Sequence, residues 1–85
     1  MNSNIENLIN KIVYRSRYRG TKEMDIFVHS FVNSVVKLLN YDELNDLNQI
    51  INLNDEEILD LCDEKANTRN FNQKIIFMLR DFKKK

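Results

Sequence analysis

One short stretch of the chain gathers side chains that could bind a charged partner. Three arginines alternate with other residues at Arg15, Arg17 and Arg19, and Gly20, the only glycine, follows directly. An arginine guanidinium is a rigid fork of N–H donors that suits carboxylates, carbonyls and phosphates. A glycine beside it lets another backbone approach closely, because no Cβ obstructs the contact. The stretch is therefore a candidate docking site.

The same residues also have a purely structural interpretation. Gly20 stands where a helix would end, a position at which glycine commonly adopts a positive φ. Glu23 and Asp25 would then fall in the first turn of the next helix, where carboxylates interact favourably with the helix dipole. Residue chemistry alone leaves both interpretations open.

The remaining reactive side chains do not form a catalytic set. His29 is the only histidine and falls beside an apolar stripe, so we expect a partly buried structural residue. Cys62, the only cysteine, lies among aliphatic residues and is expected to act as a small core side chain. The acidic residues between 55 and 64 lack the spacing and central glycine of a calcium loop. We expect no catalytic, cofactor-binding or metal-binding residues, and no enzymatic activity.

The elements that must position the docking stretch are helices. The 85 residues include no proline and one glycine, whereas β domains use both in their frequent turns. An apolar content of 42% suffices for one packed core, and the length allows one domain. We expect an all-α fold, a compact bundle of five short helices in a single domain over residues 1–85.

The first two helices flank Gly20. Ser3 and Glu6 have the spacing of a capping box, and apolar residues at helical spacing follow as far as Val13. The second helix is expected to end near Asn40 and to be the central one, because its apolar face is broad. That face consists of two rows, Met24, Phe27, Phe31, Val35 and Leu38 beside Val28, Val32, Val36 and Leu39.

Three shorter helices are predicted in the second half. Asn40 and Asn54 each precede acidic residues in the pattern of a helix start. The apolar residues of the third and fourth helices are Leu44, Leu47, Ile50 and Ile51, then Ile58, Leu59, Leu61 and Cys62. The fifth helix is predicted from about Asn70, with an apolar face of Phe71, Ile75, Met78, Leu79 and Phe82.

Charge is segregated along the chain although the net charge is zero. Residues 1–39 carry +3, residues 40–65 carry −8 and residues 66–85 carry +5. Either separate faces make separate contacts, or oppositely charged helices are neighbours in the fold. The sequence does not decide between the two.

The basic region 11–22 also suggests a second function. It interleaves tyrosines with cations, as RNA-binding surfaces do: Lys11, Tyr14, Arg15, Arg17, Tyr18, Arg19 and Lys22. The neutral chain with its acidic middle would repel a phosphate polymer over much of its surface. A small RNA- or DNA-binding module is therefore the alternative rather than the main hypothesis.

The N-terminus lacks the pattern of a signal peptide, and no apolar run approaches the roughly 20 residues of a membrane span.

The docking stretch resembles the signature of the succinate dehydrogenase assembly factors, also called flavinators or FAD assembly factors. The marker Arg-Gly-x-x-Glu runs from Arg19 to Glu23 and is followed by Asp25. Thr21 stands where a methionine is more usual, and Leu61 where many members have an aromatic residue. The similarity continues through the later helices in order and spacing.

The resemblance implies a five-helix domain that binds the flavoprotein subunit of succinate dehydrogenase, and often that of fumarate reductase. It would promote covalent attachment of FAD by holding its partner in a suitable conformation, with no stably bound cofactor of its own. By position, the partner-binding residues are Arg17, Arg19, Gly20, Glu23 and Asp25. We expect a monomer when free, in the bacterial cytoplasm or a mitochondrial matrix, with no nucleic-acid or membrane partner.

Overall fold

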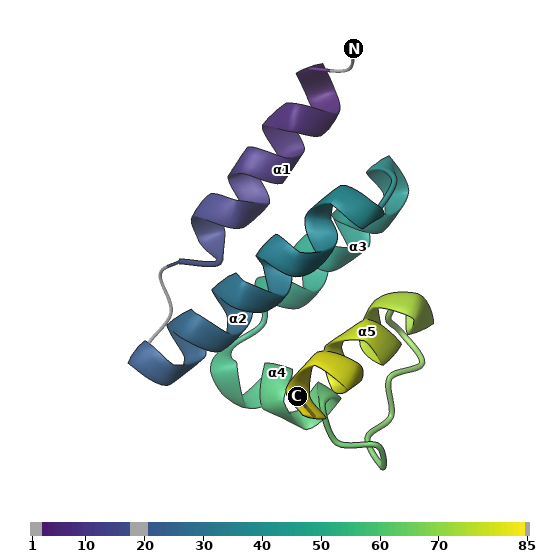
Figure 1. Ribbon diagram of the computed structural model, residues 1–85. Helices are drawn as coiled ribbons and strands as arrows, with labels where there is room; N and C mark the ends of the chain where they lie inside the picture. Colours follow the sequence, from purple (N-terminus) through teal and green to yellow (C-terminus); the bar gives the residue numbers. More distant parts are fainter. Residues whose placement is uncertain (1–2, 18–20, 85) are drawn as a thin grey trace.

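The structure is a computed structural model that describes residues 3–17 and 21–84. Within these ranges the chain forms helices and connecting turns and no strand, so the predicted all-α fold is confirmed. Figure 1 shows α2 and α3 lying between α1 and α5. The elements are α1 (Ser3–Arg15), α2 (Lys22–Val35), a 3₁₀ turn η1 (Val36–Leu38), α3 (Tyr41–Ile51), α4 (Asp55–Leu61) and α5 (Gln73–Lys84).

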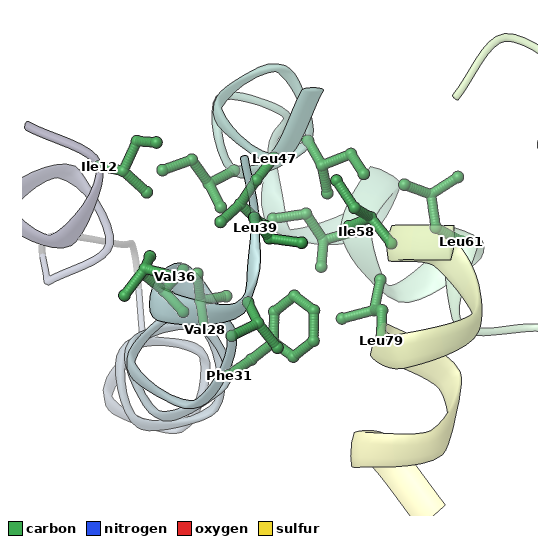
Figure 2. Close-up of a cluster of buried hydrophobic side chains, with 14 of the residues drawn as sticks. Ile12, Val28, Phe31, Val36, Leu39, Leu47, Ile58, Leu61 and Leu79 are labelled. Atoms are coloured by element: carbon green, nitrogen blue, oxygen red, sulfur yellow. The ribbon is translucent and has the colours of Figure 1, made fainter. Parts of the chain in front are cut away.

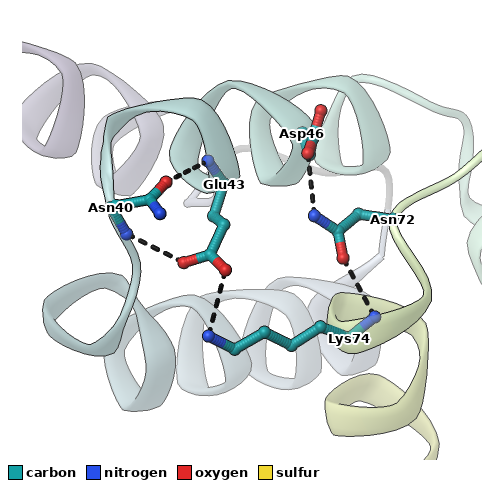
Figure 3. Close-up of polar contacts among 5 residues, drawn as sticks. All are labelled: Asn40, Glu43, Asp46, Asn72 and Lys74. Carbon is teal, nitrogen blue, oxygen red and sulfur yellow. Dashed lines mark hydrogen bonds and ion pairs between the residues drawn. The ribbon is translucent and has the colours of Figure 1, made fainter.

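Asparagine caps begin α3 and α4, as predicted. The Asn40 side-chain oxygen accepts from the Glu43 amide at 2.8 Å, and the Asn40 amide donates to the Glu43 carboxylate at 2.9 Å (Figure 3). Asn54 and Glu57 repeat this reciprocal pair at 2.8 and 3.0 Å. Each pair satisfies two amides that a helix start otherwise leaves unbonded. The analogous pair expected at Ser3 involves a side chain outside the described part of the chain.

Every helix contributes to one apolar core. Phe31 of α2 lies near its centre, with Leu47 of α3, Ile58 of α4 and Leu79 of α5 around it (Figure 2). Ile12 of α1 closes the opposite side and is fully buried. Because neither half of the chain supplies this core alone, the described residues pack as one unit.

The second helix differs from its prediction at its end. The α-helix stops at Val35 and the chain continues as a 3₁₀ turn. A 3₁₀ turn rotates about 120° per residue against about 100° for an α-helix, so side chains after Val35 leave their α-helical register. Leu38 is consequently 65% exposed, while Val36 and Leu39 are buried. The prediction that Leu38 belongs to the buried stripe is wrong.

The fifth helix begins at Gln73, three residues later than predicted. The Gln73 side-chain amide donates to the carbonyls of Thr68 and Phe71, at 2.6 and 3.0 Å. The Asn72 side chain accepts from the Lys74 amide at 2.9 Å. The two Gln73 bonds take the place of helical backbone bonds and hold the segment before Gln73 in turns. The Asn72 bond caps the second amide of α5, which has no partner within the helix, and so sets the helix start after Asn72. Phe71 still packs against the core from this position.

The acidic middle and the basic C-terminal part of the chain are neighbours. Lys74 of α5 pairs with Glu43 of α3 at 3.0 Å (Figure 3), and Lys84 pairs with Glu64 at 3.0 Å. The Arg80 guanidinium donates to the backbone carbonyls of Leu61 and Asp63 at 2.9 and 2.8 Å. Of the two explanations for the charge segregation, these contacts support the second, that oppositely charged segments are neighbours in the fold.

Candidate partner-binding site

The candidate site lies at the junction between α1 and α2. Arg17 belongs to the last turn after α1, where its amide donates to the Tyr14 carbonyl at 3.2 Å, and its side chain is exposed. Thr21 begins α2, because its hydroxyl accepts from the Met24 amide at 3.2 Å. Arg19 and Gly20 lie outside the described residues. The positive φ expected at Gly20 therefore stays a prediction.

Glu23 and Asp25 occupy the first turn of α2, as predicted. Residues two apart on a helix point to different sides, so the two carboxylates do not act together on one spot. The Glu23 side chain is exposed, whereas Asp25 is half-buried. Of the residues assigned to the site, the structure therefore places Arg17 before the junction and these two acids after it.

A buried serine and the single histidine join α1 to α2 next to the junction. The Ser16 hydroxyl donates to the Val13 carbonyl at 2.6 Å and lies 3.1 Å from His29 Nδ1. With its hydrogen committed to Val13, Ser16 Oγ accepts from His29 Nδ1–H. The Asn33 side-chain amide meets His29 Nε2 at 2.9 Å and donates to it. An imidazole that donates from Nδ1 and accepts at Nε2 satisfies all three contacts.

This arrangement confirms the prediction that His29 is a partly buried structural residue. Ser16 is fully buried, and the sequence did not identify its role. The available signal was its position four residues after Ile12, which continues the apolar face of α1 with a small polar side chain. The Ser16–His29 contact fixes the residue directly before Arg17 against α2.

Arg15, a described cation of the basic region 11–22, forms a contact with another helix of the fold. The Arg15 guanidinium donates to the Asn48 side chain on α3 at 3.2 Å. This bond ties the end of α1 to α3, and the two helices also pack against each other. Arg15 therefore helps to hold the junction in place.

An apolar groove of about 830 Å³ opens beside the junction, between the start of α2, α4 and the end of α5. We call it the α2–α4–α5 groove. Phe27 and Phe82 lie together in it, with ring centroids 6.0 Å apart. The residues that line it are Thr21, Glu23, Met24, Ile26, Phe27, Ser30, Asp55, Glu56, Leu59, Phe82 and Lys83.

The sequence did not single out this groove. Its apolar side chains include Ile26, which is 58% exposed, and Leu59, which is 43% exposed. Ile26 lies off the buried rows of α2, and an isoleucine on the solvent side of an amphipathic helix was the available signal. Leu59 was expected in the fourth helix, and the structure places it on the groove side rather than in the core.

The described residues hold no group of three or more histidine, cysteine and acidic side chains that could bind a metal ion. Cys62 is a half-buried free thiol, and burial raises its pKa because the thiolate loses hydration. It therefore behaves as a small core residue, in agreement with the sequence. None of the described helices is long and apolar enough to cross a bilayer.

These features define a small all-α domain whose candidate site is an open surface, a polar junction beside an apolar groove. The family model described as the flavinator of succinate dehydrogenase matches residues 10–83. The chain therefore belongs to this family of succinate dehydrogenase assembly factors, as the Arg-Gly-x-x-Glu stretch indicated. The match extends from α1 to α5 and includes all five residues assigned to the site. No curated protein and no solved structure matches the chain significantly.

Proposed function

We propose that this protein binds the flavoprotein subunit of succinate dehydrogenase and promotes covalent attachment of FAD to that subunit. The observation that carries the proposal is the family match over residues 10–83, which takes in the second half of α1, the junction and all of α2. The family resemblance also implies the flavoprotein subunit of fumarate reductase as a client, and co-expression with that subunit tests it.

The protein acts by holding a conformation of its client. The bond forms between a histidine of the client and its flavin, so both reacting groups belong to the client. The chain itself binds no FAD stably and supplies no nucleophile. Its whole contribution is binding energy, which stabilises the client conformation that it binds more tightly.

The docking surface is the α1–α2 junction, with Arg17, Arg19, Gly20, Glu23 and Asp25 in contact with the client. Contacts hold the described residues on both sides of the junction: Ser16 bonds to His29 before it, and Thr21 caps α2 after it. Residues that are already held in the fold lose little conformational entropy on binding, which favours affinity. Arginine and glutamate on one surface can pair with a carboxylate and a cation of the client.

The test is co-expression of the cognate flavoprotein subunit with and without this protein. Covalent flavin is read as in-gel fluorescence of the denatured subunit, normalised to the amount of subunit. We expect strong fluorescence with the protein and weak fluorescence without it. Equal flavin attachment in both cultures would reject the proposal.

A further inference from the structure

We infer that the α2–α4–α5 groove receives an apolar segment of the client flavoprotein that carries basic side chains beside its apolar ones. The inference rests on the proposed function, because it names the part of the client that a second portion of the same interface recognises. It adds a site formed by three helices to the docking residues of the junction.

The apolar part of the groove is preformed. The Phe82 ring contacts two rings of α2, with centroids 6.0 Å from Phe27 and 5.6 Å from Phe31. Phe31 is buried in the core, so these contacts hold the groove wall in one arrangement. Ile26 and Leu59 present exposed aliphatic surface in the same groove. Burying such side chains against an apolar partner removes them from water and so favours binding.

The charged residues at the edge of the groove, which we call its rim, select an occupant by the sign of its charge. Among the residues that the structure describes, three carboxylates, those of Glu23, Asp55 and Glu56, line the groove together with one ammonium group, that of Lys83. Glu23 and Glu56 are exposed, and neither forms an ion pair within residues 3–17 and 21–84. A cationic segment is attracted to this rim, and an acidic peptide or a phosphate polymer is repelled by it.

The caps of the adjoining helices strengthen this preference. The starts of α2 and α4 would otherwise offer free amides to an anion. Thr21 already accepts from the Met24 amide, and Asn54 from the Glu57 amide. The acidic residues in the first turns of both helices also offset the partial positive charge at the helix starts. The groove therefore favours a basic and apolar occupant over an anionic one.

The groove is continuous with the junction. Thr21 and Glu23 line the groove, and they stand one and three residues after Gly20 in the chain. A client bound at the junction therefore reaches the groove without crossing other parts of the surface. This continuity is the reason for assigning both sites to one client.

The first experiment compares the affinities of two variants for the purified flavoprotein subunit by calorimetry. Ile26→Ser/Leu59→Ser removes two exposed apolar side chains from the groove, and we expect Kd to rise about tenfold or more. Phe77→Ser is the matched control, because Phe77 is 73% exposed on α5 and does not line the groove. We expect its Kd to stay within about twofold of the wild type. Circular dichroism should show the same helicity in all three proteins.

The second experiment tests the charge of the occupant. Glu56→Lys should weaken binding and make the affinity less dependent on salt concentration. Asp42→Lys is the control, since Asp42 is an exposed acid in the first turn of α3 and lies outside the groove. Tighter binding by Glu56→Lys would show that the occupant is acidic and would overturn the inference.

A photo-crosslinking side chain at position 59 identifies the occupant directly. We expect a crosslink to a flavoprotein peptide in which Lys or Arg neighbours a large apolar residue. A crosslink to a second copy of this chain, or to an acidic peptide, would overturn the inference.

The two proposals fail in different ways. If the wild-type protein promotes flavin attachment and Ile26→Ser/Leu59→Ser binds normally, the groove inference is wrong and the proposed function stands. A wild-type protein that neither binds the flavoprotein nor raises its covalent flavin removes the proposed function, and the groove inference with it.

Discussion

Gly20 is the residue on which the docking proposal depends most directly. The docking proposal has the client backbone approach closely here, and a side chain at this position would obstruct that approach. We expect Gly20→Arg to abolish binding to the flavoprotein while far-UV circular dichroism stays nearly unchanged. Asn70→Arg adds the same side chain at an exposed position between α4 and α5 and should bind normally. Normal binding by Gly20→Arg would remove Gly20 from the interface.

Ser16 and His29 allow a separate test of how the junction is supported. Ser16→Ala leaves His29 Nδ1–H without its acceptor beside a buried position, which costs about 1–3 kcal/mol of unfolding free energy. Ser34→Ala is the control, because within residues 3–17 and 21–84 the Ser34 hydroxyl bonds to the Phe31 carbonyl of its own helix, at 2.7 Å, and to no other helix. We expect its effect to stay within about 0.5 kcal/mol in urea denaturation. Equal effects of the two variants would show that the contact between the helices adds no stability.

The end of α2 gives a prediction at the scale of the element. Leu38 is exposed and Leu39 is buried because the α-helix gives way to a 3₁₀ turn at Val36. Leu39→Ala should therefore destabilise the fold by about 2–4 kcal/mol. Leu38→Ala should change it by less than about 0.5 kcal/mol. The reverse order in urea denaturation would mean that the α-helix continues to Asn40.

The helix starts were predictable from sequence because their signals are local. Asn40 and Glu43 are three residues apart, and the capping pair needs nothing from the rest of the fold. The change to a 3₁₀ turn at Val36 was not predictable in this way, since Val36 and Leu39 pack into a core that all the helices build. The late start of α5 has the same origin in part, because the Asn72 side chain also donates to Asp46 of α3 at 2.8 Å.

The candidate site also has parts that local sequence signals predict and parts that depend on the whole fold. The sequence placed Glu23 and Asp25 correctly in the first turn of α2. The roles of Arg19 and Gly20 came from the family signature and stay predictions. The groove could not be predicted, because Ile26, Leu59 and Phe82 belong to three helices that meet only in the folded chain.

At the scale of the whole molecule, the contacts of Glu43, first within the start of α3 and then across to α5, make stability depend on pH. The Asn40 backbone amide, and then Lys74, lower the pKa of Glu43 below its ordinary value of 4.5. A carboxyl group with a lowered folded-state pKa stabilises the fold above its unfolded pKa, and this contribution disappears as the pH falls through the folded value. We expect stability to fall as the pH drops below about 4.5.

Glu43→Gln should weaken this acid dependence, measured as the change of urea midpoint with pH. Lys74→Met should weaken it less, because the stronger contribution of the Asn40 amide remains. An unchanged slope in Glu43→Gln would show that other carboxyl groups cause the acid sensitivity. The Lys84–Glu64 pair lowers the pKa of Glu64 in the same direction and adds to the residual slope.

The modest burial of α1 has a consequence for hydrogen exchange. Among its described side chains α1 buries one apolar residue, Ile12, whereas α2 buries five. Amides in α1 should therefore exchange through a partial opening, at a lower free energy than those of α2 and α3. A client bound at the junction would oppose this opening, so deuterium uptake in α1 should slow more on binding than uptake in α3, which does not line the groove. The helix with the fewest buried residues thus becomes the most sensitive reporter of the complex.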